Sequence, residues 1–288
     1  MNDIYKRQNE NSAILYLNSA RKEYSKGKII AIIMFFSMVV IPIILSVVVA
    51  VINNDIFSTI SIVLSFIIFI IGEIENFCLK KQKLLGASLQ FKFDQIVLGL
   101  KYSNKYLEDS LIDSFSINAS LAKYKNKIDK SLYNWYADYS EDINDIAVFK
   151  CLKENILWDN SLRKKYLVLI ISIFTLLCTA LVCISILLNQ SLLHFISIIS
   201  FILPLLSYYI RGIKKLSSDI VKQNKIKVTI EKDNELCKLK NTRKLRDNNT
   251  QLSIELFNYR KSLYLVPNWF FKITRKKYEN IFNEKGIS

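Results

Sequence analysis

Two long stretches of the sequence, residues 29–72 and 166–210, contain no lysine or arginine, although the chain of 288 residues carries 40 of them. Each stretch holds two runs of about twenty apolar residues, the helix length that crosses a hydrocarbon core of about 30 Å. Charged side chains are costly at bilayer depth, so their absence fits a membrane environment. The pattern excludes an ordinary soluble domain. It predicts an all-α membrane protein with four transmembrane helices in two hairpins and a mostly helical cytoplasmic domain.

Residues that hold metals or perform catalysis are also scarce. The chain has one histidine, and its five cysteines include no CxxC pair, so the sequence predicts neither a metal site nor a disulfide framework. Glycine-rich phosphate loops and the common hydrolase motifs are missing from the sequence. We therefore expect no catalytic residues, no cofactor and no enzymatic activity.

Basic residues flank the outer ends of the predicted spans 29–52, 56–71, 166–188 and 192–210. Lysine and arginine next to a span favour the cytoplasmic side, so we expect both termini and the middle segment to be cytoplasmic. The predicted organisation is an amphipathic helix at 1–27, hairpins at 28–78 and 166–211, a middle segment at 79–165 and a helical segment at 212–288.

The net charge of +15 therefore belongs almost wholly to the predicted cytoplasmic side. Such a surface can attract anionic lipid headgroups or bind phosphate-bearing ligands, and we favour lipids. The densest basic run comprises Lys238, Lys240, Arg243, Lys244 and Arg246. It is either a solvated face or a contact for nucleotide or lipid phosphate.

Local patterns suggest the secondary structure of the charged segments. Residues 3–26, 143–157 and 214–240 are expected to be helical. A partly alternating stretch that ends at Gly99 favours a short strand over 91–100. A polar run over 241–249 is expected to separate two helices.

Several residues of the spans are candidates for packing or gating. Ser58, Ser61 and Ser65 form a stripe that serves either close helix packing, which we favour, or an aqueous path. Pro42 and Pro204 should bend the first and fourth spans, as static kinks or as gating hinges. Glu73 would face a pore mouth if subunits formed a ring, and otherwise pairs with lysines.

Sequence motifs occur in a fixed order around the two hairpins. Near the start stand Arg7-Gln8-Asn9-Glu10 and Ala20-Arg21-Lys22-Glu23-Tyr24. In the middle stand Phe93-Asp94, Val97-Leu98-Gly99-Leu100, Asn134-Trp135-Tyr136 and Trp158-Asp159-Asn160-Ser161-Leu162-Arg163. Near the end stand Arg260 and Leu265-Val266-Pro267-Asn268-Trp269-Phe270-Phe271. Over nearly its whole length the chain resembles the bacterial SMODS-associated four-transmembrane (S-4TM) family of pore-forming effectors.

The resemblance implies a role in cyclic-oligonucleotide anti-phage defence (CBASS). In such systems a nucleotidyltransferase senses phage and makes a cyclic nucleotide messenger, and an effector then harms the infected cell. The implied effector is a homo-oligomer in the bacterial inner membrane that opens a pore. Its partners would be membrane lipids and the messenger, with no DNA or RNA binding. The alternative is a membrane-anchored nucleotide sensor or scaffold without pore activity.

Messenger contact is expected from cationic and aromatic side chains, because guanidinium groups hold phosphates and aromatic rings stack on bases. The candidates are Trp135, Tyr136, Trp158, Arg163, Arg260 and Trp269. The tryptophans could equally form the core of the cytoplasmic domain or lie at the level of the lipid headgroups.

Overall fold

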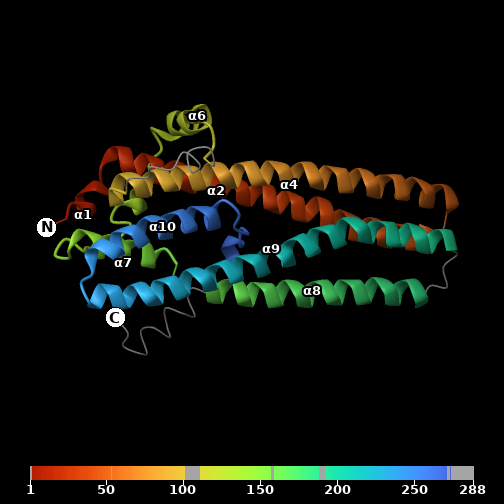
Figure 1. Ribbon diagram of the computed structural model, residues 1–288. Helices are drawn as coiled ribbons and strands as arrows, with labels where there is room; N and C mark the ends of the chain where they lie inside the picture. The colour runs from red at the N-terminus through yellow and green to blue at the C-terminus, as the bar shows by residue number, and fades with distance from the viewer. Residues whose placement is uncertain are drawn as a thin grey trace. The chain divides into compact units, whose positions relative to one another are not determined.

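The chain is an all-α protein (Figure 1). The computed structural model describes residues 2–52, 54–100, 111–156, 159–187, 192–270 and 273. It is 84% helical, and no strand occurs in these described ranges. The helices are α1 (Ile4–Arg7), α2 (Asn11–Phe35), the π-helix η1 (Phe36–Val40), α3 (Ile41–Ile52), α4 (Asp55–Leu98), α6 (Ser114–Tyr124), the 3-10 helix η2 (Lys130–Leu132), α7 (Asn144–Glu154), α8 (Asp159–Leu187), α9 (Leu192–Lys238) and α10 (Thr242–Arg260). The predicted fold class is confirmed.

The chain divides into two compact units. Unit 1 comprises Met1–Gly27, Lys80–Ser161 and Asp219–Leu263. Unit 2 comprises Lys28–Leu79, Leu162–Ser218 and Tyr264–Ser288. Helices α2, α4 and α9 each contribute residues to both units.

Unit 2 contains the apolar segments. Three helical stretches of the described chain are long and apolar enough to cross a membrane, namely Asn11–Val49, Asp55–Leu98 and Ile196–Lys238. The predicted third span coincides with α8, and several side chains toward the end of this helix lie outside the described residues. Tyr166 and Ile170 of α8 pack against Leu205 and Tyr209 of α9.

The serines of the spans lie between packed helices. Ser58 and Ser197 are fully buried, and the Ser197 hydroxyl donates to the Ser58 backbone carbonyl at 3.1 Å. Ser61, Ser65 and Ser200 are buried as well. Small side chains allow helices to approach closely, so the packing interpretation of these serines is confirmed.

A π-helical turn precedes Pro42 in the first span. Proline has no N–H, and its ring clashes with the carbonyl four residues earlier, here that of Met38. The π-helix η1 places its wider turn at this point, between α2 and α3. Pro204 differs, because it lies inside the continuous helix α9.

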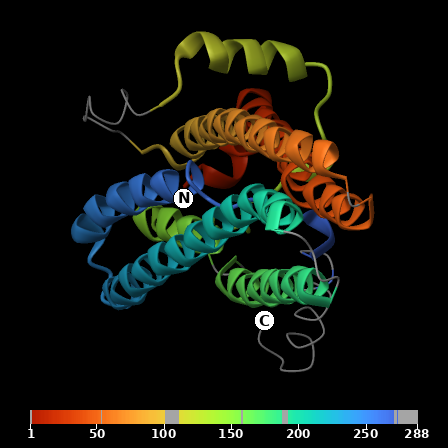
Figure 2. The same cartoon turned by 90° about the vertical axis from the view of Figure 1, so that its right-hand side faces the viewer.

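Unit 1 has a large apolar core between α1, the end of α4, α7 and α10. Phe93, Leu132, Phe149 and Leu252 are among its fully buried side chains. Figures 1 and 2 show α7 beside α10. Asp145 on α7 accepts hydrogen bonds from Arg246 at 3.1 and 3.2 Å, and thereby joins the two helices.

Helix α6 packs on the same unit through a smaller cluster. Ile117 of α6 lies with Ala20 of α2 and Leu89 of α4. The helix begins at a side-chain cap, because the Asp113 carboxylate accepts from the Ser116 backbone N–H at 2.8 Å. This carboxylate therefore has a lowered pKa, mainly through its hydrogen bonds to Ser116.

The predicted strand over 91–100 is wrong, because α4 continues as helix to Leu98. Phe91 packs toward Phe257, while Phe93 and Val97 face the main core. Two faces of one helix are thus buried against different partners. The sequence consequently shows partial alternation although the backbone has the helical period.

Gly99 ends this long helix. Its φ of +67° is a left-handed conformation that glycine adopts readily. Its N–H donates to the Gln95 carbonyl at 3.1 Å.

The predicted break over 241–249 is also wrong. Helix α10 already begins at Thr242, and the Asn241 side chain caps it by accepting from the Lys244 N–H at 3.4 Å. The polar residues stay helical because the buried residues Leu245 and Asn249 lie four apart on one face.

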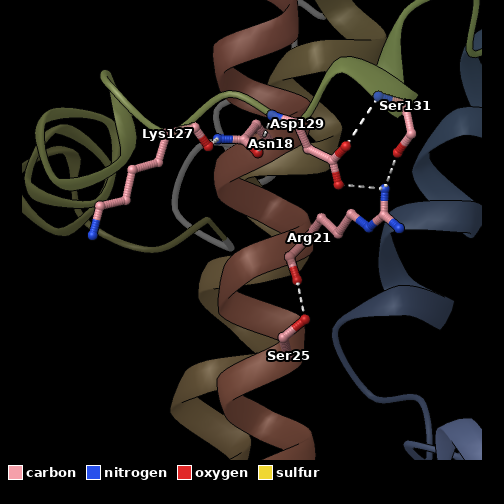
Figure 3. A network of polar contacts seen from close by, with 6 residues as sticks. All are labelled: Asn18, Arg21, Ser25, Lys127, Asp129 and Ser131. Atoms are coloured by element: carbon pink, nitrogen blue, oxygen red, sulfur yellow. Dashed lines mark hydrogen bonds and ion pairs between the residues drawn. The ribbon is translucent and has the colours of Figure 1, made fainter.

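Side chains of α2 hold the loop that follows α6 (Figure 3). Arg21 pairs with Asp129 at 3.2 Å and donates to the Ser131 hydroxyl at 2.9 Å. Asn18 donates to the Lys127 carbonyl at 3.1 Å and accepts from the Asp129 N–H at 3.3 Å. Residues far apart in the sequence are therefore joined within unit 1.

Candidate functional site

A buried polar network lies at the centre of unit 1. Asp94 on α4 accepts from the Tyr136 hydroxyl at 2.7 Å and from the Arg260 guanidinium at 2.5 Å. All three side chains are buried. Asn155 adds a hydrogen bond to the Tyr136 oxygen at 3.0 Å. Three motifs widely separated in the sequence thus meet at one carboxylate.

The N-terminal motif joins the same region. The Gln8 side chain accepts from the Tyr136 N–H at 2.8 Å and donates to the Tyr136 carbonyl at 3.1 Å. The neighbouring Arg7 donates from Nε to the Val97 carbonyl at 2.9 Å. Because Gln8 is fully buried, it satisfies a backbone pair that has no access to water.

The electrostatics of the network favour a structural role. Burial lowers the pKa of the Arg260 guanidinium, but Asp94 and the nearby tyrosines outweigh this effect and the pKa is raised. Burial, followed by Asp94, raises the pKa of Tyr136 well above its usual value, so its hydroxyl keeps its proton and donates. These groups hold their protons at neutral pH and lack the poised pKa of an acid–base catalyst.

A second buried carboxylate, Glu23, ties α2 to two other helices of unit 1. It accepts from Lys26 at 2.7 and 2.8 Å, from the Ser120 hydroxyl at 2.8 Å, and from Gln82. Burial lowers the pKa of Lys26, yet its hydrogen bonds, first to Glu23, raise the pKa overall. The motif at Ala20–Tyr24 therefore also has a structural role: Ala20 packs in a buried cluster, and Glu23 accepts hydrogen bonds from neighbouring helices.

The six residues predicted for messenger contact have different surroundings. Tyr136 and Arg260 meet at Asp94 in unit 1, and the neighbouring Trp135 is 41% exposed. Arg163 is buried in unit 2 and donates to the Tyr264 carbonyl at 2.9 Å. Trp269, also in unit 2, is 54% exposed, and Trp158 lies outside the described residues.

A polar groove of about 430 Å³ lies between α9 and α10 in unit 1. Lys232 and Lys244 supply positive charge and Glu235 supplies negative charge, while Thr229 and Gln251 supply polar side chains. Asp233 is buried, and its Oδ1 accepts from Asn248 at 2.7 Å. Among the described residues its Oδ2 has no hydrogen-bond partner. The site prediction did not include this groove, although Lys244 belongs to the basic run recognised in the sequence.

Glu73, one of the gating candidates, lies near a contact between the first two spans. Glu73 forms an ion pair with Arg211 of α9, and Arg211 also donates to the Met38 sulfur at 3.2 Å. Glu75 accepts from the Ser37 hydroxyl at 2.7 Å. A side chain added at Gly72 would lie 2.2 Å from the Met38 sulfur, so the buried Met38 side chain would have to move.

No cluster of metal-ligating residues is found within the part of the chain that the structure describes. The fold defines an all-α membrane protein with an apolar unit and a charged unit. Buried polar contacts join the helices of the charged unit to one another.

The chain belongs to the family of SMODS-associating 4TM effector domains, whose family model matches residues 2–286. This match confirms the resemblance of the motifs. A probable CBASS effector molecule of Bacillus cereus (strain VD146) is 26% identical over 290 residues, which cover 95% of this chain and 94% of that protein. No solved structure matches the chain.

Proposed function

We propose that this chain is the membrane effector of a CBASS anti-phage system. In this proposal it binds a cyclic oligonucleotide made by an associated nucleotidyltransferase and, as a homo-oligomer, opens a pore in the bacterial inner membrane. The observation that carries the proposal is the family match, which includes both the apolar and the charged unit. The relative described as a probable CBASS effector adds support, because it matches over nearly the whole length of both chains.

The pore is proposed to form between subunits. The serines of the spans are buried between helices of one subunit, which leaves them unsuited to line a water path. Helix α4 instead exposes large apolar residues, among them Ile60, Val63, Ile67 and Ile70. Such a surface suits contact with lipid or with another subunit.

The messenger is proposed to bind in the groove between α9 and α10. Lys232 and Lys244 can contact phosphate, and the uncommitted Asp233 oxygen can accept from a ribose hydroxyl or a base N–H. Trp135 offers an exposed aromatic face in the same unit. A messenger opens a pore only if it binds the open state more tightly than the closed one. Helix α9 contributes residues to both units, which supports a mechanical link.

Dye release from liposomes tests both parts of the proposal. Purified protein is reconstituted and exposed to a panel of cyclic di- and trinucleotides, and binding is measured separately by calorimetry. Release that depends on one nucleotide is the expected result. Binding without release would favour the membrane-anchored sensor or scaffold. Dye release that is the same with and without each nucleotide would contradict gating by a messenger.

The groove is tested with the double variant Lys232→Gln/Lys244→Gln. Hydrogen bonds to charged groups contribute about 1.5–3 kcal/mol each, so the loss of two should lower nucleotide affinity at least about a hundredfold. The control is Lys225→Gln/Lys227→Gln, which removes two exposed lysines of the same helix outside the groove. An equal loss in both variants would mean that only overall charge matters. Trp135→Ala tests in the same assay whether this exposed tryptophan, which does not line the groove, contributes to nucleotide binding.

A further inference from the structure

Unit 2 contains a mostly apolar cavity of about 320 Å³ that the proposed function does not use. Faces of α2 and α8, the residues Tyr208 and Tyr209 of α9, and the segment after α10 form its walls. On α2 the lining residues Lys28, Ala31, Ile32 and Phe35 recur at helical spacing, so they occupy one face. The face begins with a charge and becomes apolar over about 10 Å, at 1.5 Å per residue.

The wall formed by α8 begins at a tyrosine and is then apolar. Tyr166, Ile170 and Ile173 line the cavity from the start of the predicted third span toward its middle. Ile32 and Ile173 are also 52% and 40% exposed, so the lining is continuous with the outer apolar surface of the unit. The cavity therefore adjoins the surface that the predicted topology places against the hydrocarbon of the cytoplasmic leaflet.

The segment 264–269 closes the charged end. The Tyr264 carbonyl accepts from Arg163 at 2.9 Å, and Asn268 accepts from the Lys28 ammonium group at 2.5 Å. Phe270 packs on Tyr166, with ring centroids 4.9 Å apart. Lys28 is thereby held in the cavity wall at the depth where the first predicted span begins.

We propose that this cavity binds one anionic phospholipid of the cytoplasmic leaflet. Its acyl chain would lie along Ile32, Ile170 and Ile173, and its phosphate would lie near Lys28. An acyl chain fits this lining because Ala31, Ile32, Ile170 and Ile173 offer apolar contact, while the hydroxyls of Tyr166 and Tyr208 already hydrogen-bond with Tyr264. The positive charge of Lys28 selects an anionic headgroup over a zwitterionic one. This inference does not depend on nucleotide binding or on pore formation.

Quenching of Trp269 by brominated lipid tests the site in the full-length protein. Trp269 lines the cavity, and Trp135→Phe with Trp158→Phe leaves it as the sole tryptophan. Nanodiscs contain phosphatidylcholine and phosphatidylglycerol, with either one or the other brominated on its acyl chain. One lysine near an anionic surface gives about a fivefold preference for an anionic lipid over a zwitterionic one. Brominated phosphatidylglycerol should therefore reach the same quenching at about fivefold lower mole fraction than brominated phosphatidylcholine.

Two variants, each with a matched control, test whether the preference for phosphatidylglycerol arises at this cavity. Lys28→Gln should abolish it, whereas Lys164→Gln removes an exposed lysine outside the lining and should leave it unchanged. Ala31→Phe should fill the cavity and weaken quenching, whereas Ala180→Phe adds the same ring at an exposed position of α8 and should have no effect. Circular dichroism checks that each variant remains helical.

Equal quenching by the two lipids would overturn the proposal. So would an equal effect of Lys28→Gln and Lys164→Gln, because the preference would then reflect the general charge of the surface. Displacement of the brominated lipid by a cyclic dinucleotide would assign the cavity to a different ligand and would also overturn it. Loss of preference in Lys28→Gln alone would support the proposal even if Ala31→Phe failed to fold.

Discussion

Asp94 shows how a single buried side chain can organise a charged unit. Its carboxylate accepts hydrogen bonds from both Tyr136 and Arg260, and the Gln8 side chain accepts from the backbone N–H of the same tyrosine. A buried ion pair is rarely a large net source of stability, but breaking one leaves an uncompensated charge. The effect of substitution should therefore be large although the pair itself adds little.

Asp94→Asn is expected to destabilise the protein by about 3–5 kcal/mol, because Arg260 keeps its charge and loses its carboxylate. Unfolding by a chaotrope in detergent micelles, followed by circular dichroism, measures the change. Asp129→Asn is the control, since its pair with Arg21 is largely exposed and should contribute little. A similar loss in both variants would contradict the central role of Asp94.

Gly72 is expected to be required for the close approach of the first two spans. Gly72→Ala would place Cβ 2.2 Å from the Met38 sulfur, and Met38 is fully buried. Overpacking of this kind costs about 1–3 kcal/mol. Gly212→Ala is the matched control in α9, because its nearest neighbour, Tyr264, would lie at an ordinary 3.6 Å. If thermal unfolding shows that both variants keep the parent stability, the predicted clash is absent.

At the scale of the element, buried partners keep α4 and α10 helical through stretches that look like a strand or a break in the sequence. Helix α4 passes through a stretch with partial strand alternation because both of its faces pack on helices. Helix α10 includes a polar run because Leu245 and Asn249 are buried. The conformation of Gly99, in contrast, is a local requirement at the end of α4.

Gly99→Ala should destabilise the end of α4, because an L-residue in the left-handed region costs about 1–2 kcal/mol. Hydrogen exchange of the amides near Gln95 provides the measurement, and faster exchange is expected. Gly99→Asn should cost less, since asparagine tolerates this conformation better. Identical exchange in the alanine variant and the parent would show that the backbone here is not constrained.

Helix α3 and the π-helix before it bear on the gating hypothesis for Pro42. A local π-turn lies directly before Pro42, and such turns within helices are frequent at functional sites. Pro204 lies in a helix without such a turn among its described residues. The two prolines, which look equivalent in the sequence, thus differ as candidate hinges.

At the scale of the whole molecule, topology determines which surfaces a cytoplasmic messenger can reach. Cys78 is exposed and follows the second span. In a variant with Cys78 as the sole cysteine, an impermeant maleimide should label the protein only after permeabilisation of protoplasts. Asp55→Cys, placed in a cysteine-free background, should be labelled in intact protoplasts. The reverse pattern would contradict the orientation deduced from the lysines and arginines.

The sequence by itself determined the membrane class and the family, because apolar runs and motifs depend on composition and order along the chain. It also identified Tyr136 and Arg260 as residues of interest, but not Asp94 as their common partner. Only the tertiary structure decided that the serines pack helices, that α4 stays helical to Leu98, and that Lys28 lies in the wall of an apolar cavity. Such features depend on contacts between residues far apart in the chain, which hydrophobic periodicity does not encode.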